Sequence, residues 1–140
     1  MPEIKFYCPS WGSEELVWLD FSDKVKHAGY DGVEVYPLQV PHEKEEMLNT
    51  LQSNNLEFSL LHSEMTEGRD VEKYYASLAR NLYELATHQA PELKPQFITS
   101  QTGREYYTMD QMAVCFAICA RISEETGIKI VHETLSLIHI

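Results

Sequence analysis

The sequence predicts an α/β protein built on a parallel sheet. Short runs rich in β-branched and aromatic residues alternate with amphipathic stretches of helical length, and a fifth β-rich run follows the fourth such stretch. A helix between two strands carries the chain back across the sheet, so that neighbouring strands run parallel. Two architectures satisfy this pattern, an open doubly wound sheet and a closed barrel.

The first predicted strand, residues 4–8, is broken by Pro9. The helix after it carries apolar residues at steps of three and four, the spacing of a single helical face. These residues are Trp18, Phe21, Val25 and Ala28. Gly29 fits the left-handed position that follows a helix. The second predicted strand, residues 32–36, ends at Pro37.

The second helix follows Pro41 and has a narrow apolar stripe of Met47, Leu48 and Leu51. The third predicted strand, residues 56–62, leads into a charged loop. The helix after that loop has the broadest apolar face of the chain. This face consists of Val71, Tyr74, Tyr75, Leu78, Leu82 and Leu85.

The fourth predicted strand, residues 96–100, precedes a loop around Gly103. Thr108, with Gln111 three residues later, predicts a capping box at the start of the fourth helix. The apolar residues of this helix are Met112, Cys115, Phe116, Cys119 and Ile122. Gly127 ends the helix, and the fifth predicted strand is residues 128–132.

Composition limits the function classes. The chain has 140 residues, the length of one domain, and a net charge of −11 with only 11 basic residues, which do not cluster. This charge argues against binding nucleic acid through phosphates. No apolar stretch reaches the ~20 residues that span a bilayer, and the N-terminal residues do not have the pattern of a signal peptide. We therefore expect a cytoplasmic protein without a membrane partner.

Cysteine usage gives no sign of a disulfide framework or a zinc ribbon. The chain has three cysteines, an odd number, and Cys8 is far in sequence from Cys115 and Cys119. The last two lie four residues apart among apolar neighbours on a predicted helix, which favours packing in the core.

Polar and aromatic residues follow nearly every predicted strand, at the end where barrel enzymes place their chemistry. They are Tyr7 to Trp11, Glu34, Tyr36, His62, Thr99, Gln101, His132 and Glu133. No G-x-G-x-x-G turn or Walker-type lysine loop occurs, so a nucleotide-binding open sheet is not favoured. Carboxylates, imidazoles and aromatic side chains together suit a divalent metal and a polyhydroxylated ligand.

Each candidate has an alternative interpretation. Glu34, between two valines, is either functional or part of an ion pair or an exposed strand end. His62 is either functional or a hydrogen-bonded core histidine. Glu133 is the best metal candidate, against a solvated strand end. Trp11 either stacks on a sugar or packs within its loop. His132 has the opposite parity to Glu133, so we expect it in the core or behind the site.

Five segments in order resemble the sugar phosphate isomerase/epimerase family, the xylose isomerase-like TIM barrels. The segments are "IKFYCPSWGS", "KVKHAGYDGVEVYP", "FSLLHSE", "QFITSQTGREYYT" and "TGIKIVHET", and they lie within residues 3–134. The resemblance implies a partial (β/α)8 barrel of about five parallel strands and four helices over residues 1–134. Residues 135–140, which do not resemble the family, would be an unrelated tail.

The resemblance also implies an activity and its residues. It implies isomerisation or epimerisation of a sugar or related polyol, by proton transfer next to a carbonyl held on a divalent metal (Mn, Mg, Co or Zn). Glu133 matches the metal ligand after the fifth strand, and His62 and Glu34 match substrate-site positions, so these three are the expected catalytic residues. Trp11, Tyr7 and Gln101 are the expected substrate contacts.

The resemblance implies that the chain stops after the fifth strand of an eight-stranded barrel. We therefore expect an incomplete, inactive site that binds no metal by itself, and open sheet edges that favour self-association. Three alternatives stay open: a non-catalytic half-barrel that binds another copy, a phosphodiesterase resembling endonuclease IV, which the charge disfavours, and an open flavodoxin-like domain.

Overall fold

The computed structural model describes residues 3–88 and 93–133. It has α/β architecture with five parallel strands and four helices, which confirms the predicted fold class. The finer prediction, part of a (β/α)8 barrel, is not confirmed. The expected tail at residues 135–140 lies outside the described residues.

The described residues form two compact units. Residues 3–61 and 93–96 make up the first, and residues 62–88 and 97–133 make up the second. None of the helices in the described residues is long and apolar enough to cross a membrane.

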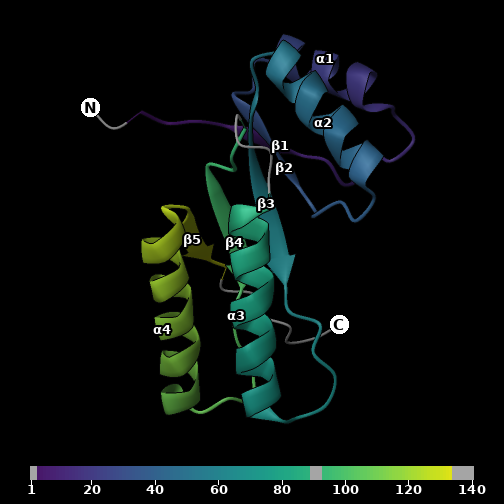
Figure 1. The fold of residues 1–140 in the computed structure, drawn as a ribbon. Coiled ribbons are helices and arrows are strands. Elements are labelled where there is room, and N and C mark those ends of the chain that lie inside the picture. The colour runs from purple at the N-terminus through teal and green to yellow at the C-terminus, as the bar shows by residue number, and fades with distance from the viewer. Residues whose placement is uncertain (1–2, 89–92, 134–140) are drawn as a thin grey trace. The chain divides into compact units, whose positions relative to one another are not determined.

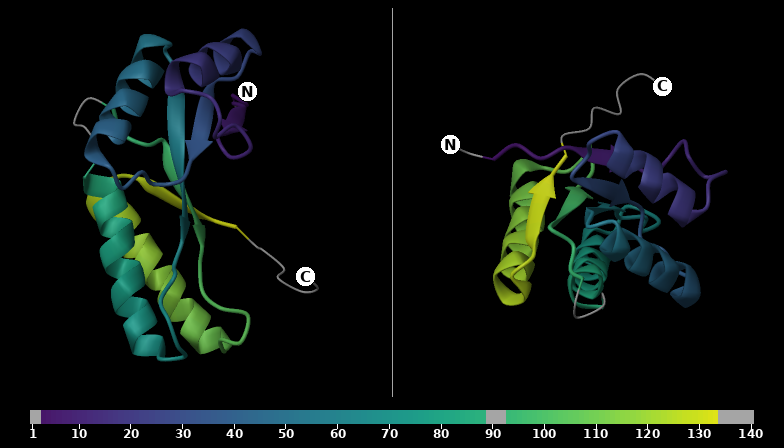
Figure 2. Two further views of the ribbon diagram at one scale, coloured as in Figure 1. Left: turned by 90° about the vertical axis from the view of Figure 1, so that its right-hand side faces the viewer. Right: turned by 90° about the horizontal axis from the view of Figure 1, so that it is seen from above.

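The first unit contains three strands and two helices (Figure 1). In chain order these are β1 (Tyr7–Pro9), α1 (Trp18–His27), β2 (Gly32–Val35), α2 (Pro41–Ser53) and β3 (Glu57–Ser63), whose last two residues belong to the second unit. β1 pairs in parallel with β2, and β2 with β3. α1 and α2 pack side by side (Figure 2).

The core of the first unit comes from alternating strand residues and from one face of each helix. Val33, Val35 and Phe58 are at most 1% exposed on the strands. The buried face of α1 includes Phe21 and Val25, as the spacing predicts. The buried residues of α2 are Met47, Leu48 and Leu51, which confirms the predicted stripe.

The first strand is shorter than predicted, because it begins at Tyr7 rather than at residue 4. Phe6 donates its backbone N–H to the Asp31 carboxylate over 2.8 Å, and its carbonyl accepts from the Asp31 N–H. These bonds fasten the chain to the turn before β2. Ile4 and Phe6 are 74% and 63% exposed, so this apolar segment is not part of the core.

The second unit contains α3 (Val71–Thr87), β4 (Phe97–Gln101), α4 (Met109–Thr126) and β5 (Lys129–His132). β4 and β5 pair in parallel, and α3 and α4 lie side by side (Figures 1 and 2). The buried residues of the two helices are Tyr74, Leu78, Leu82 and Ala86 on α3 and Cys115, Cys119 and Ile122 on α4. All three cysteines are free thiols, and the two on α4 pack in the core as predicted.

The ends of α4 follow the sequence signals. Thr108 accepts a hydrogen bond from the Gln111 N–H, and the Gln111 side chain accepts one from the Thr108 N–H, which is the predicted capping box. Gly127 has φ of 72°, a conformation that costs least for a residue without Cβ. α3 begins differently, since the Asp70 carboxylate accepts from the backbone N–H groups of Glu72 and Lys73.

Candidate functional site

A pocket of about 250 Å³ lies at the carboxyl ends of β1 and β2 in the first unit. We call it the aromatic pocket. The residues that define it are Trp11, Glu14, Trp18, Phe21, Val35 and Tyr36, with Ser10, Ser13, Leu16 and Leu38 completing the lining. The ring centroids of Trp11 and Tyr36 are 5.4 Å apart at an interplanar angle of 50°, and both side chains are exposed. Two aromatic rings therefore offer part of their surface to a ligand.

The loop after β1 holds its shape through its own backbone. The Ser10 N–H donates to the Glu34 carbonyl over 2.9 Å, which ties the loop to β2. The N–H groups of Ser13 and Leu16 donate to the carbonyls of Ser10 and Ser13. These three donors are therefore engaged within the protein.

The Glu14 carboxylate takes up a further donor of this loop. Gly12, at φ of 85°, donates its N–H to Glu14 Oε1 over 2.9 Å. The backbone N–H groups of Gly12 and of Glu14 itself lower the pKa of this carboxyl. The anion bound by this loop is thus the carboxylate of its own residue Glu14.

Tyr7 lies at the opposite end of the strands from this pocket. It pairs with Gly32, which pairs with Glu57, so the three residues are at the amino ends of β1, β2 and β3. The Tyr7 hydroxyl donates to Glu57 Oε2, and burial together with this carboxylate raises the pKa of Tyr7. A Cβ on Gly32 would lie 2.6 Å from the Tyr7 ring, so only glycine fits beside it.

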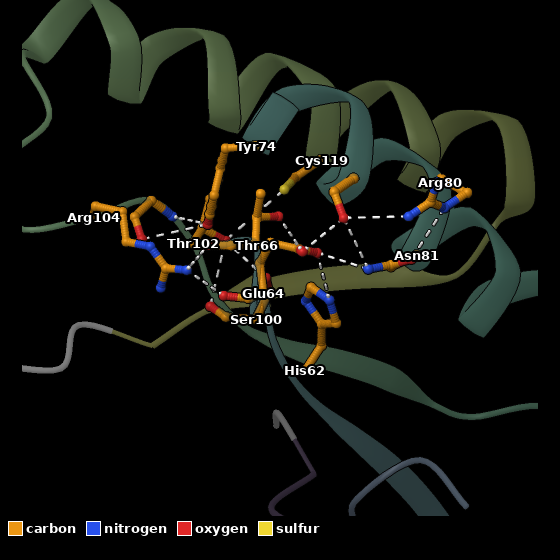
Figure 3. Close-up of polar contacts among 12 residues, drawn as sticks. His62, Glu64, Thr66, Tyr74, Arg80, Asn81, Ser100, Thr102, Arg104 and Cys119 are labelled. Atoms are coloured by element: carbon orange, nitrogen blue, oxygen red, sulfur yellow. Dashed lines mark hydrogen bonds and ion pairs between the residues drawn. The ribbon is translucent and has the colours of Figure 1, made fainter. Parts of the chain in front are cut away.

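The second unit contains a cluster of polar side chains around the buried Glu64, which we call the Glu64 cluster (Figure 3). Glu64 is 2% exposed and accepts hydrogen bonds from Thr66 Oγ1 at 2.6 Å, Ser77 Oγ at 2.8 Å and Asn81 Nδ2 at 2.9 Å. His62 Nε2 lies 3.5 Å from Glu64 Oε2, within reach of an ionic contact. Neither ring nitrogen of His62 makes a hydrogen bond among the described residues.

The environment of Glu64 favours its charged form. Burial alone would raise the pKa, but His62 and the donors Thr66, Ser77 and Asn81 together lower it to about 2. A buried carboxylate without such donors would be costly. Glu64 therefore holds the loop after β3 against α3.

Arg104 joins the loop after β4 to the same region. Its Nη2 donates to the carbonyl of Glu64 over 2.6 Å, and its guanidinium lies 5.2 Å from the centre of the Tyr74 ring. The Tyr74 hydroxyl accepts from the Gly103 N–H over 2.7 Å. Both loops that precede a helix in this unit are thus bound to α3 by side chains.

The carboxyl ends of β4 and β5 bring together two predicted residues. Gln101 Nε2 donates to Glu133 Oε2 over 3.1 Å, and Glu133 is exposed. The residues next to this pair are also in contact. Thr102 Oγ1 lies 2.9 Å from His132 Nδ1, and the His132 ring packs edge-on against Phe116. Burial lowers the pKa of His132. This histidine is exposed, like Glu133, and contacts Phe116 of α4, so it does not lie in the core.

The predicted site residues therefore fall into separate groups. In the first unit, Trp11 lines the aromatic pocket, the Glu34 carbonyl holds the loop beside it, and Tyr7 bonds to Glu57. In the second unit, Gln101 contacts Glu133, and His62 contacts Glu64.

Glu14 and Glu64 were not among the predicted residues. Glu64 follows His62 by two positions, and in extended backbone this spacing puts two side chains on one side of the chain. That spacing could have revealed the pair. Glu14 had no comparable signal, because its role depends on the turn at Gly12.

The described residues do not fit a metal centre. No group of three or more His, Cys, Asp or Glu side chains among them could hold a metal ion. Glu133, the expected ligand, contacts an amide instead.

Comparison with known proteins finds similarity of structure but no similarity to a family model or a curated sequence. No family model matches the chain, and no curated protein matches it. Among solved structures, it is similar to the apo form of 3-keto-D-glucoside 4-epimerase YcjR from E. coli, with a TM-score of 0.67 and 15% sequence identity. The match covers 96% of this chain and 57% of the epimerase chain. At this identity the likeness concerns the fold.

These findings correct the family expected from the sequence. The fold is similar to that of this epimerase, no family model supports the expected assignment, and a partial barrel is not confirmed. The chain is therefore not assigned to the sugar phosphate isomerase/epimerase family of xylose isomerase-like barrels, nor described as a barrel truncated after its fifth strand. The motifs were short and rich in residues that any βα unit needs, such as the glycine and valines of "GYDGVEV".

Proposed function

We propose that the chain binds a sugar or a related polyol and belongs to an enzyme that epimerises or isomerises it. The observation that carries the proposal is the aromatic pocket, where Trp11 and Tyr36 are exposed at the carboxyl ends of two strands. Aromatic rings pair well with the apolar C–H faces of a sugar ring, and the nearby Ser10 and Ser13 hydroxyls can bond to its hydroxyl groups. The likeness of fold to a 3-keto-D-glucoside 4-epimerase supports this class of substrate.

Glu133 is the proposed acid–base residue. An exposed carboxylate can accept a proton from a carbon next to a carbonyl, which leaves a planar enolate. A proton from water, delivered to the opposite face of the enolate, then inverts that carbon, and the carboxyl group releases the first proton to solvent. Gln101 bonds to one carboxylate oxygen and leaves the other available for the proton. His62 and Glu34 remain proposed orienting groups for substrate hydroxyls.

A divalent metal is part of the proposal only through Glu133, which would be one of its ligands. The described residues gather no further set of ligands. Mass spectrometry of the purified chain after incubation with Mn²⁺ or Zn²⁺ tests whether Glu133 and other groups retain a metal.

The experiment for the enzymatic proposal is exchange with solvent. A 3-keto-D-glucoside is incubated with the chain in D₂O, and proton NMR follows the signal of the C–H groups next to the carbonyl. We expect catalysed loss of one such signal, and a decrease of about 10²-fold or more in Glu133→Gln. Glu124→Gln, which alters an exposed carboxylate on α4, is the matched control. Exchange no faster than in buffer, or equal in both variants, would refute the role of Glu133.

A second candidate, a module that binds another copy of itself, rests on the exposed Ile4 and Phe6 before β1. Exposed apolar side chains beside a strand favour association. Light scattering after size exclusion should then show a dimer that Phe6→Lys dissociates. A monomer at all concentrations would exclude this candidate.

A further inference from the structure

We propose that the aromatic pocket accepts uncharged sugars or glycosides and excludes phosphorylated ones, because the Glu14 carboxylate already occupies the anion-binding position of its loop. This inference rests on the proposed function, since it specifies the ligand of the same pocket. It concerns three features of the described residues: the charges of the lining, the donors of the loop, and the place of Glu14.

The lining has no positive charge to offer a phosphate. Among the described residues, those that line the pocket are apolar, aromatic or hydroxylic, apart from the carboxylate of Glu14. Proteins bind phosphate through Arg, Lys or a set of free backbone N–H groups. Among the described residues, no Arg or Lys lines this pocket.

Four backbone N–H groups of this loop are already engaged within the protein. A glycine at positive φ within a loop often opens a concave set of N–H groups that binds anions, and Gly12 has such a conformation. Here the Gly12 N–H donates to Glu14 Oε1 over 2.9 Å. The N–H groups of Ser10, Ser13 and Leu16 donate to carbonyls of the protein. A phosphate would have to displace these bonds and approach a carboxylate of the same sign.

The size of the pocket agrees with a single ring. Its volume of about 250 Å³ is just below the usual range for small-molecule sites, about 300–1,000 Å³. Trp11 and Tyr36 supply the contacts to the sugar ring. The serine hydroxyls can donate hydrogen bonds to the sugar hydroxyl groups or accept from them, and the Glu14 carboxylate can accept from them. A neutral sugar therefore satisfies the lining without an unpaired charge.

The two tryptophans of the chain allow a direct test. Both Trp11 and Trp18 line the pocket, so intrinsic fluorescence reports on its occupancy. The full chain is titrated with methyl β-D-glucopyranoside, D-glucose 6-phosphate and inorganic phosphate. We expect saturable change with the glucoside, and binding of the sugar phosphate weaker by roughly tenfold or more.

Variants test whether the Glu14 carboxylate is the cause of the exclusion of phosphate. Glu14→Ala vacates the anion position and should strengthen binding of the sugar phosphate by roughly tenfold, with Glu14→Gln as a second variant that keeps the side-chain volume. Glu15→Ala removes the same charge from the neighbouring exposed position, outside the lining, and should behave like the wild-type chain. Circular dichroism of each variant confirms that it is folded.

The outcomes separate this inference from the proposed function. If the wild-type chain binds the glucoside and the sugar phosphate equally, or if Glu14→Ala gains no more than Glu15→Ala, the exclusion of phosphate is refuted while sugar binding stands. If no sugar binds to any of these proteins, the sugar pocket itself is refuted. Preference for the glucoside, together with a gain confined to the Glu14 variants, supports both.

Discussion

His62 Nε2 lies 3.5 Å from Glu64 Oε2, with side chains that are 7% and 2% exposed. The sequence pattern predicted a role for His62, yet Glu64 makes more hydrogen bonds than His62 does. Glu64 accepts from Thr66, Ser77 and Asn81 and thereby joins a loop to α3. The pair is thus an organising element of the second unit, and its properties can be measured without knowledge of a substrate.

Removal of the Glu64 carboxylate should destabilise the chain. Glu64→Ala removes the acceptor of the part-buried Ser77 hydroxyl and one of the two acceptors of the Asn81 amide, at a cost of about 2–4 kcal/mol in the free energy of unfolding. Glu67→Ala changes an exposed carboxylate in the same loop and should cost less than about 0.5 kcal/mol. Urea unfolding measures both, and equal values would contradict the structural role of Glu64.

The charge of Glu64 predicts a loss of stability in acid. Its pKa is lowered by folding from 4.5 to about 2, so its contribution is complete above about pH 5 and disappears as the pH falls toward 2. The contribution is on the order of 3 kcal/mol. Unfolding experiments between pH 7 and pH 2 should show a smaller dependence on pH for Glu64→Gln than for the wild type. Identical pH profiles would exclude this carboxyl as a source of acid sensitivity.

Sequence patterns were sufficient to predict the helices and strands, but not every residue at which they begin. Periodicity located the four helices, and the signals at Thr108 and Gly127 placed both ends of α4 correctly. Such features depend on neighbours within a few residues, which can be read directly along the chain. The late start of β1 depends instead on Asp31, whose side chain and backbone bind Phe6 from 25 positions away.

The candidate site was predictable only in part, for the same reason. The positions of Gln101 and Glu133 directly after the fourth and fifth predicted strands indicated that both belong at carboxyl ends, and they are in contact. Tyr7 was included because it is near the end of the strand predicted at residues 4–8, but β1 begins at Tyr7, and pairing with Gly32 places this residue at the amino end of its strand. Glu14 binds the loop that contains it, and this role requires the positive φ of Gly12.

The capping box predicts a measurable contribution of Thr108. Thr108→Ala removes the acceptor for the Gln111 N–H and should lower the free energy of unfolding by about 1 kcal/mol. Thr108→Ser retains the hydroxyl and should be close to the wild type. A loss of similar size in both variants would indicate that packing of the threonine methyl group, rather than the cap, stabilises the helix.

Trp11 should contribute to ligand affinity through its ring. Trp11→Ala removes one of the two exposed rings, and we expect binding of methyl β-D-glucopyranoside by calorimetry to weaken by about tenfold. Tyr83→Ala, which removes an exposed aromatic side chain from α3, is the matched control and should leave binding unchanged. Unchanged affinity in Trp11→Ala would exclude this ring as a sugar contact.

The most direct test of the sugar pocket is NMR of the chain labelled with ¹⁵N, because its two tryptophans give two indole N–H signals, both from residues of the pocket. On titration with methyl β-D-glucopyranoside, we predict that both indole signals shift progressively and saturate together with the backbone signals of Ser10 to Glu14. Indole signals that remain in place at saturating sugar, or shifts confined to other parts of the chain, would contradict the central claim.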